Sequence, residues 1–289
     1  MKKWKTKETE NERNRKPGKQ QTREVQEGHS RMAQKKKTTV TVVSQKQIAA
    51  QIYDLWVETE LAEEARAGQF VAVYPHNAAT LLPRPISICE VDRDRSRLRL
   101  VYRVAGKGTA EFSACSAGES LEVLGVLGNG FPVEKAVGRK VLLMGGGIGI
   151  PPMLQLAREL EAEKHILLGY RDQDLFLQED LGQYGQVYIA TEDGSVGVQG
   201  NVMDIIRVNA LEADMIMACG PMPMLRAIKK YAAEQGIAAY ISLEERMACG
   251  VGACLGCVCR TKEIDAHSHV HNARICTDGP VFEAEEVEI

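Results

Sequence analysis

Short alternating and apolar segments follow one another closely in the first half of the chain. Five of them are rich in β-branched and aromatic residues, at 39–43, 52–57, 70–74, 85–91 and 97–104. The last alternates hydrophobic and polar residues with a period of two, as a strand with one buried face does. This spacing predicts a small antiparallel barrel, interrupted by one helix at 109–115.

After Gly138 the pattern changes to buried apolar runs that alternate with amphipathic segments. The runs at 141–144, 165–170, 187–190, 215–218 and 238–242 predict strands, and the segments at 151–157, 174–182, 200–209 and 221–235 predict helices. Such alternation is typical of a parallel sheet with helices on both faces. From Leu243 onward the chain is rich in cysteine and irregular, with one strand expected at 258–261.

The predicted fold class is therefore α/β plus β, in three folded domains. We expect an antiparallel barrel at 38–137, a parallel α/β nucleotide-binding domain at 138–242 and a small cysteine-rich domain at 243–289. Residues 1–37 hold 13 Lys and Arg against 5 Asp and Glu, and the first 31 contain almost no aliphatic side chains. This composition predicts a disordered basic tail.

Two other interpretations of the tail stay open. It could be a basic arm for nucleic acid or a membrane, or it could lie upstream of a translation start at Met32. The overall charge of −3 argues against a dedicated nucleic-acid binder. No apolar run reaches the roughly 18 residues that a membrane span needs, and no signal peptide is present. We therefore expect a soluble, cytoplasmic protein that binds neither nucleic acid nor membrane.

Eight cysteines are many for a chain from a reducing compartment, where clustered cysteines usually bind metal. Cys249, Cys254 and Cys257 have the spacing C-x4-C-x2-C, and Cys276 follows further on. This is the plant-type [2Fe–2S] pattern, set in a glycine-rich loop that can bring backbone N–H groups close to a cluster. Structural zinc usually requires two C-x2-C pairs, and unrelated buried thiols are the other alternative.

Other candidate ligands lie near these cysteines. Cys259 falls in the expected strand, and we expect it to pack rather than to coordinate. Asp265, His267, His269 and His271 could form a metal site, but an exposed hairpin between the third and fourth cysteines is the favoured interpretation.

Two glycine-rich turns predict a nicotinamide nucleotide site. The apolar run at 141–144 leads into a glycine cluster that includes Gly147 and Gly149, followed by Pro151 at the start of a helix. Glycines allow a diphosphate to approach the backbone, and a helix N-terminus favours its negative charge. The turn Cys219-Gly220-Pro221 follows another apolar strand, so that two strand ends could form a floor for the nucleotide. Whether Cys219 belongs to this site or is merely a small buried residue stays open.

A third motif lies in the barrel. Arg84-Pro85-Ile86-Ser87 precedes Gly106-Lys107-Gly108-Thr109, which opens the short helix. An arginine, a hydroxyl and a helix N-terminus together can hold a diphosphate.

The order of these motifs resembles the ferredoxin–NADP reductase superfamily and, within it, the electron-transfer subunits of NAD-dependent dihydroorotate dehydrogenases. The order is Arg-Pro-Ile-Ser, Gly-x-Gly-Thr, the 127–131 segment Leu-Gly-Asn-Gly-Phe, the glycine-rich loop, Cys-Gly-Pro and the cysteine loop. The resemblance covers about residues 38–289 and is most specific at 242–249 and 276–282.

This resemblance implies an FAD-binding barrel, an NAD domain and a [2Fe–2S] domain. By position, FAD would be bound by Arg84, Pro85, Ile86, Ser87, Val101, Tyr102, Arg103, Gly108 and Thr109, and the cluster by Cys249, Cys254, Cys257 and Cys276. A separate FMN-containing dihydroorotate dehydrogenase subunit would oxidise dihydroorotate in pyrimidine (UMP) biosynthesis, in a heterotetramer with two of each chain. Electrons would pass from FMN through the cluster and FAD to NAD+.

The residues agree with such a division of labour. A flavin can store the two electrons that a one-electron cluster delivers and a nicotinamide accepts as hydride. No set of side chains in the chain has to act as acid, base or nucleophile, so we predict no catalytic residue and no oxidation of dihydroorotate by this chain alone.

Two other functions remain as alternatives. One is the flavin and iron–sulfur subunit of a ferredoxin:NADP or sulfide-linked oxidoreductase, and the other is a non-catalytic iron–sulfur sensor. After the second strand of the nucleotide domain, Arg171 favours NADP and Asp172 favours NAD, so the sequence leaves the choice of nucleotide open.

Overall fold

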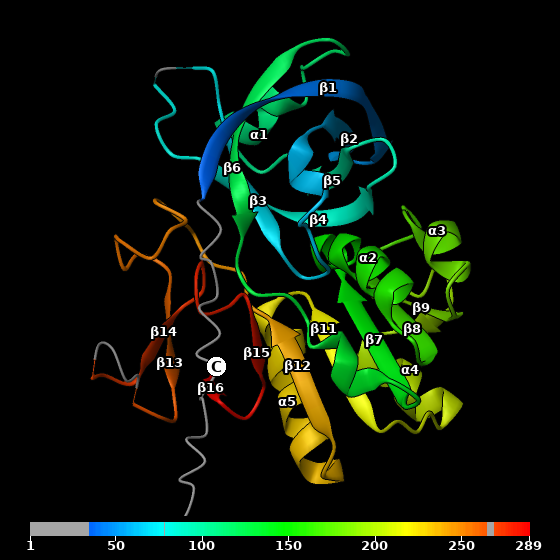
Figure 1. Cartoon of the computed structure of the whole chain (residues 1–289). Coiled ribbons are helices and arrows are strands. Elements are labelled where there is room, and N and C mark those ends of the chain that lie inside the picture. Colours follow the sequence, from blue (N-terminus) through cyan, green and yellow to red (C-terminus); the bar gives the residue numbers. More distant parts are fainter. Residues whose placement is uncertain (1–34, 78, 265–268) are drawn as a thin grey trace, which may run out of the picture. The chain divides into compact units, whose positions relative to one another are not determined.

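Residues 35–77, 79–264 and 269–289 are described by the computed structural model of the chain, and Lys35–Ile289 is one compact unit (Figure 1). The predicted tail up to residue 34, including Met32, lies outside these ranges. Among the described residues, no helix is long and apolar enough to cross a membrane.

A closed antiparallel barrel forms the upper part of Figure 1. Its strands are paired in the order β1-β2-β5-β4-β3-β6, and Val40, Leu55, Ile88 and Leu121 fill its interior. The elements are β1 (Lys36–Ala49), β2 (Ile52–Glu58), a 3-10 turn (Glu60–Ala62), β3 (Phe70–Tyr74), β4 (Arg84–Asp92), β5 (Arg97–Arg103), α1 (Lys107–Phe112) and β6 (Ser120–Leu127). The predicted barrel is confirmed.

Three details of the barrel differ from the sequence prediction. The strand β6 was not predicted, because Gly125 interrupts its apolar pattern, yet it closes the barrel between β1 and β3. The strand β1 extends to Ala49, since its first half pairs with β6 and its second half with β2. The helix α1 begins at Lys107 and ends at Phe112 rather than spanning 109–115, because the Thr109 hydroxyl accepts hydrogen bonds from the backbone just before it.

The second sheet has seven strands in the order β10-β9-β8-β7-β11-β12-β15, all parallel except β15. Its strands are β7 (Lys140–Gly146), β8 (Glu163–Tyr170), β9 (Gln186–Thr191), β10 (Val198–Gln199), β11 (Met215–Cys219), β12 (Ala238–Ser242) and β15 (Val281–Glu283). Its helices are α2 (Pro151–Glu159), α3 (Gln178–Gly182), α4 (Val202–Asn209) and α5 (Met222–Gln235), with 3-10 turns at Val133–Ala136 and Gly147–Gly149.

Helices cover both faces of this sheet because its central strands are apolar on both sides. In β7, Val141 and Leu143 pack into the core that contains α2, whereas Leu142 and Met144 pack into the core that contains α4 and α5. The predicted parallel α/β arrangement is thus confirmed. Only α3 is clearly shorter than predicted: Asp172 accepts a hydrogen bond from the backbone of Asp174, so a turn occupies the segment expected to start the helix.

A small third sheet pairs β14 (Asn272–Arg274), β13 (Val258–Thr261) and β16 (Val287–Glu288). Its strands β13 and β14 form the hairpin expected between the third and fourth cysteines. His269 and His271 are exposed there, whereas Asp265 and His267 lie outside the described residues. The domain boundaries stay predictions. The pairing of β15 with β12 crosses the boundary predicted between residues 242 and 243.

A buried ion-pair network joins the barrel to the second sheet. Arg99 donates from Nε and Nη2 to the two carboxylate oxygens of Asp54, at 3.0 Å each, and from Nη1 to Glu90 at 3.1 Å. Its Nη2 also lies 3.5 Å from Asp180 of α3. Although burial alone would lower the pKa of Arg99, the hydrogen bonds to Asp54 raise it. The guanidinium therefore stays charged in the interface.

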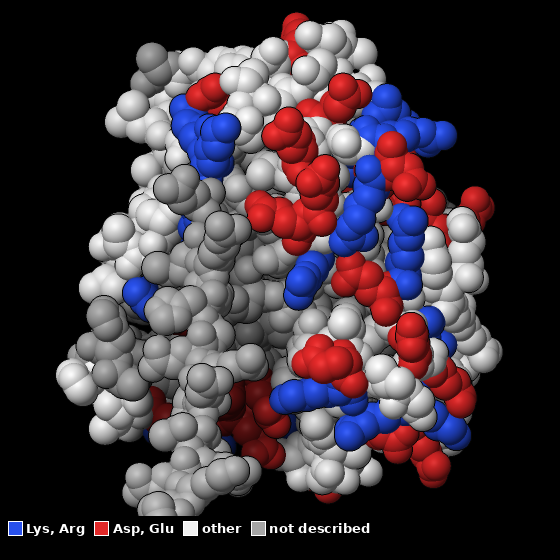
Figure 2. Space-filling model, in the orientation of Figure 1, with Lys and Arg blue, Asp and Glu red and all other residues white. Residues whose placement is uncertain are grey.

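Both signs of charge also cover the outer surface. In Figure 2 acidic and basic side chains are intermixed over the right-hand part of the face shown. Neighbouring opposite charges there reduce each other's field.

Removing one partner of the buried pair is expected to destabilise the protein strongly. Asp54→Ala leaves Arg99 without its bidentate partner and should lower the free energy of unfolding by about 3–5 kcal/mol. The matched control on the same strand is Glu58→Ala. Its side chain is 58% exposed and lies 3.7 Å from Arg97, so its loss should cost less than about 1 kcal/mol. Urea denaturation of both variants measures the difference, and equal shifts would contradict the assignment.

Candidate functional site

A cavity of about 750 Å³ opens between the barrel and the segment that follows β12. The barrel contributes Arg84, Pro85, Ile86 and Ser87 from β4 and Val101, Tyr102 and Arg103 from β5. The opposite wall comprises 242–247 and Pro280, and Ile148 of the glycine-rich turn also lines the cavity. Residues from all three predicted domains thus meet around one space, whose size is in the range of cofactor pockets.

Arg84 and the start of α1 lie together at this cavity. The Nη1 of Arg84 donates to the carbonyl oxygen of Leu82 at 2.6 Å. A Cβ atom at Gly108 would lie 2.8 Å from Arg84 Nε, so any other residue at this position would displace the guanidinium. Thr109 lines the cavity as well, but its hydroxyl is already engaged with the backbone of Ala105 and Gly106. An anionic group in the cavity would meet the Arg84 guanidinium and backbone N–H groups of α1.

The β5 residues contribute to the cavity in different ways. Tyr102 is buried in the barrel core, where it stacks on Tyr53 and donates its hydroxyl proton to Gln45 at 3.1 Å. Burial raises the pKa of the Tyr102 hydroxyl. Arg103, by contrast, is exposed and adds a second positive charge to the lining. A cofactor would therefore meet the charge of Arg103 but not a free hydroxyl of Tyr102.

The two glycine-rich turns meet at the carboxyl end of the parallel sheet. Gly147 has a φ of 53°, which disfavours residues with a Cβ. A Cβ at Gly149 would lie 2.3 Å from the carbonyl oxygen of Cys219, so this glycine lets the turn after β7 contact the end of β11. Cys219 itself is buried, and burial raises the pKa of its thiol. The structure thus brings together the two turns from which the sequence predicted a nucleotide floor.

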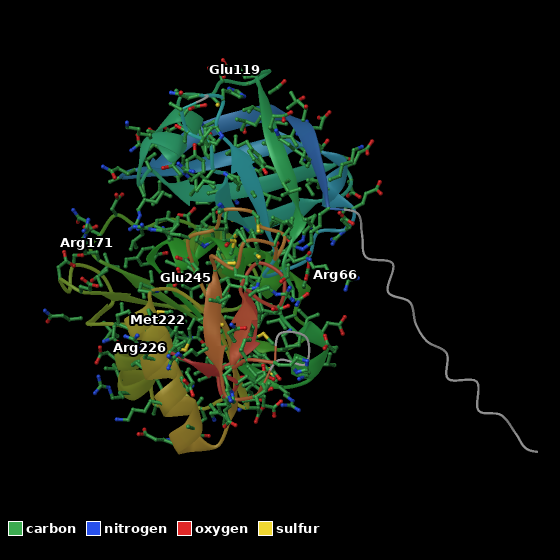
Figure 3. The ribbon with its side chains drawn as sticks, turned by 90° about the vertical axis from the view of Figure 1, so that its left-hand side faces the viewer. Arg66, Glu119, Arg171, Met222, Arg226 and Glu245 are labelled. Carbon is green, nitrogen blue, oxygen red and sulfur yellow. The ribbon has the colours of Figure 1, made fainter. Side chains whose placement is uncertain are left out.

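Further side chains line this edge of the sheet. In Figure 3, Arg171 after β8, Met222 and Arg226 of α5, and Glu245 after β12 lie on the same side of the molecule, below the barrel. The Arg171 side chain is 86% exposed and lies 3.8 Å from Asp172. Sequence reasoning had not singled out Arg226 or the acidic residues after β12, because charged residues at single positions carry no motif.

The four cysteines of the predicted cluster site lie near one another. The thiols of Cys249 and Cys254 interact with each other, as do those of Cys257 and Cys276, and Cys276 also interacts with Cys249. No group of three or more His, Cys, Asp or Glu that could hold one metal ion occurs in the described ranges. Four neighbouring cysteines fit a two-iron cluster, which takes two of them at each iron.

Backbone N–H groups surround these sulfur atoms. Val251 and Cys254 donate to Cys249 Sγ at 3.4 Å, Gly252 donates to Cys276 Sγ at 3.2 Å, and Gly256 donates to Cys254 Sγ at 3.4 Å. Burial opposes ionisation of Cys249, but the N–H donors outweigh it and lower its pKa to about 6. Burial and the neighbouring Cys257 raise the pKa of Cys276 to about 12. The N–H donors of the loop thus stabilise negative charge at Cys249, whereas at Cys276 burial and the neighbouring thiol outweigh the N–H of Gly252.

The remaining thiols have other surroundings. Cys259 lies on β13, packs against the second core, and has its pKa raised to about 11 by burial. Cys89 is buried beside Arg99, and burial raises its pKa too. Cys115 is half-buried after α1. These positions agree with a packing role for the three thiols.

The cluster segment is held against the barrel next to the cavity. Asn129 donates from its backbone to Gly279 at 2.7 Å, and from its side chain to Thr277 at 3.1 Å and Asp278 at 2.9 Å. Met247 lines the cavity and also packs against the core that contains Cys257 and Cys276. Met247 stands two residues before Cys249, so the cavity is lined by the start of the cysteine loop.

Comparison with known proteins identifies this arrangement. Residues 244–288 match the model of the iron–sulfur cluster binding domain of dihydroorotate dehydrogenase B. The dihydroorotate dehydrogenase B (NAD(+)) electron transfer subunit of Geobacillus sp. (strain WCH70) is 44% identical over 259 residues, which cover 87% of this chain and 98% of that protein. The chain belongs to this family of electron transfer subunits.

Other comparisons agree with this family. The electron transfer subunit from Bacillus caldolyticus is 43% identical over 255 residues, covering 86% of this chain and 97% of that protein. Among solved structures, a NADH-dependent reduced ferredoxin-NADP oxidoreductase superposes with a TM-score of 0.77 at 28% identity, covering 86% of this chain and 89% of that chain. As an electron transfer subunit the protein is an oxidoreductase component, and the expectation of FAD, an iron–sulfur cluster and NAD is confirmed.

A methyl group at Gly108 is expected to weaken flavin binding in this electron transfer subunit. Gly108→Ala would displace the Arg84 guanidinium, and the loss of one charge-assisted contact should raise the FAD dissociation constant on the order of tenfold, or about 1.4 kcal/mol. In the matched control, Gly182→Ala on α3, the new Cβ comes no closer than 4.0 Å to Val187 and does not line the cavity. Flavin content and FAD titration of both apoproteins measure the effect. Equal FAD affinity in the two variants would count against a role of Arg84.

Proposed function

We propose that this electron transfer subunit accepts electrons from an FMN-containing dihydroorotate dehydrogenase catalytic subunit and delivers them to NAD+, in a complex with two copies of each chain. The observation that carries the proposal is the cavity where the barrel, the glycine-rich turn at Ile148 and the segment that leads through Met247 to the cysteine loop meet. Relatives at 43–44% identity over most of the chain bear the name of this subunit, whereas the ferredoxin-NADP neighbour has 28% identity. We therefore prefer the dihydroorotate dehydrogenase subunit to the subunit of a ferredoxin:NADP oxidoreductase.

The proposed FAD site is the cavity. Arg84 and Arg103 would neutralise the diphosphate, with Gly108 and Thr109 at the start of α1 beside them. Pro85, Ile86, Ser87, Val101 and Tyr102 would form the wall along β4 and β5. When bound, FAD supplies a store for two electrons, and it exchanges a hydride with a nicotinamide. The chain contributes binding and orientation.

The nicotinamide would lie on the turns that contain Gly147, Gly149 and Cys219. This position follows from Ile148, which belongs to the first turn and also lines the cavity. A nucleotide on the two turns would therefore reach the same space as the flavin. The carboxyl ends of parallel strands are the usual place for such a ligand.

The proposed ligands of the [2Fe–2S] cluster are Cys249, Cys254, Cys257 and Cys276. Backbone N–H groups that donate to the sulfur atoms of Cys249, Cys254 and Cys276 support this assignment, since such donors stabilise thiolate. Around these cysteines, the apolar side chains of Val251, Leu255 and Val258 are exposed, with Leu255 at 62%. We take these three residues as the docking face for the catalytic subunit, because exposed apolar groups are typical of interaction sites.

The ligand assignment predicts opposite results for two neighbouring cysteines. Cys257→Ser should remove the cluster, because serine is a poor replacement for a buried thiolate ligand. Cys259→Ser, two positions along the chain, should retain it. Iron content and visible circular dichroism of the purified variants are the measurements. Normal iron in Cys257→Ser, or loss of iron in Cys259→Ser, would contradict the assignment.

Co-expression with the candidate FMN subunit tests the function itself. The complex should reduce NAD+ with dihydroorotate, whereas the isolated chain should not. Leu255→Asp should prevent co-purification of the two chains, because it places a charge in an apolar contact. The matched control is Val208→Asp, which changes an equally exposed apolar residue on α4. A complex active only with NADP+, or one that lacks FAD, would refute the proposal.

A further inference from the structure

Glu244 is an acidic residue in the cavity that sequence analysis did not single out. It follows β12 and lines the same space as Ser87 and Arg103. The residue is exposed to solvent, yet the protein around its carboxyl group removes enough water to raise its pKa, against the opposing charge of Arg103. The carboxyl therefore keeps a proton at higher pH than an ordinary glutamate and can still exchange it with water.

Charged and titratable groups approach Glu244 from several elements. Arg103 comes from β5, and Cys219 at the end of β11 is close enough for the charge of Glu244 to raise the pKa of its thiol. The Ser242 hydroxyl forms a hydrogen bond with Cys219. On the same segment Glu245 accepts a hydrogen bond from the backbone of Arg246 at 3.2 Å. Glu244 thus lies between the barrel and the strand end that carries the nicotinamide turn.

This is the part of the cavity where the flavin ring has to lie. A hydride can pass only if the ring and the nicotinamide are in contact. Arg84 and α1 would hold the diphosphate, so the ring would extend toward Ile148 and Cys219. In that position the carboxyl of Glu244 would lie beside the ring and would also be exposed to water.

The chemistry requires a proton at this place. A cluster delivers electrons without protons, whereas the flavin must carry a hydrogen on its ring before it can donate a hydride. Glu244 and Glu245 are the carboxyl groups among the residues that line the cavity. Of these two, Glu244 has its pKa raised by burial.

We propose that Glu244 exchanges the proton that accompanies electron transfer between the cluster and FAD. The assignment rests on the proposed function. FAD takes up two electrons, delivered singly from the cluster, and one proton from Glu244, which gives FADH⁻. Hydride transfer to NAD+ then yields NADH and restores FAD, and the Glu244 carboxylate regains a proton from solvent. In the opposite direction, NADH donates a hydride to FAD, and Glu244 accepts the proton released when two electrons leave for the cluster.

Electron flow from NADH to the cluster separates hydride transfer from proton release in one experiment. Hydride transfer from NADH to FAD needs no proton from the protein. The first electron that passes from FADH⁻ to the cluster releases no proton either; the proton leaves with the second electron, which can pass only after an added one-electron acceptor such as cytochrome c has reoxidised the cluster. Stopped-flow mixing of the holoprotein with NADH records flavin bleaching. Mixing of the NADH-reduced holoprotein with an excess of the acceptor records the return of oxidised flavin, which gives the rate of electron exit through the cluster, called here the cluster rate. In Glu244→Gln the ratio of the cluster rate to the bleaching rate should fall on the order of 100-fold, the usual contribution of a positioned acid or base.

The pH dependence gives a second readout. Because the carboxylate is the proton acceptor in this direction, the wild-type cluster rate should rise with pH through the pKa of Glu244 and then level off. Since burial raises that pKa, the rise should lie above the range of an ordinary glutamate. Glu244→Gln should abolish the rise, and Glu244→Asp should restore it with a lower rate. An equilibrium redox titration should show a changed pH dependence of the flavin potential in Glu244→Gln.

The FAD and iron contents of the variants, and a matched Glu245 variant, separate a proton-transfer role of Glu244 from a structural one. FAD and iron contents equal to those of the wild type establish that Glu244→Gln is folded and loaded. If they are reduced, the comparison is made with Glu244→Asp, whose rate and pH profile must then differ from those of the wild type. An unchanged ratio and pH profile, or the same loss in Glu245→Gln, would overturn the assignment. If NADH fails to bleach the wild-type flavin, the proposed function itself fails, and the assignment with it.

Discussion

The contact of Asn129 with residues 277–279 fixes the C-terminal cysteine segment relative to the barrel and the cavity. Its backbone and side-chain N–H groups occupy three successive carbonyl oxygens of that segment. Gly128, with a φ of 75°, lets the chain turn there, because a Cβ would lie 2.5 Å from Pro280. Two residues further, β15 adds to β12 at the edge of the parallel sheet. The segment that carries Cys276 is thus tied to the barrel on one side and to the sheet on the other, as a chain that passes electrons between fixed centres requires.

The sequence predicted those parts of the fold whose signal is local. Apolar runs such as 141–144 predicted the central strands, and the spacing of Cys249, Cys254 and Cys257 predicted an iron–sulfur domain. It missed β6, because Gly125 breaks the alternation, and β15, because three residues carry no periodic signal and its place depends on pairing with β12. The cavity could be anticipated on the barrel side, where the Arg84 motif lies. Its other wall comes from tertiary packing alone.

Glu244 shows why that wall was missed. In the sequence it is one of two adjacent glutamates in a segment that resembles the cluster loops, and nothing distinguishes it from its neighbour. In the structure the two differ: burial within the cavity raises the pKa of Glu244, and Glu245 bonds to its own segment. Identical residue types thus acquire different chemistry from the walls around them, and only the fold supplies those walls.

The cysteines extend this argument from carboxyl groups to thiols. Cys249 and Cys259 are ten residues apart, yet the pKa of the first is lowered to about 6 and that of the second is raised to about 11. Burial raises the pKa at both positions, and backbone N–H groups lower it at both. At Cys259 burial outweighs the N–H groups of the strands, whereas at Cys249 the N–H groups outweigh burial. The irregular backbone of the glycine-rich loop directs the N–H groups of Val251 and Cys254 at Cys249 Sγ. The loop therefore stabilises a charge on its thiol better than the strand does, and for this its glycines matter as much as its cysteines.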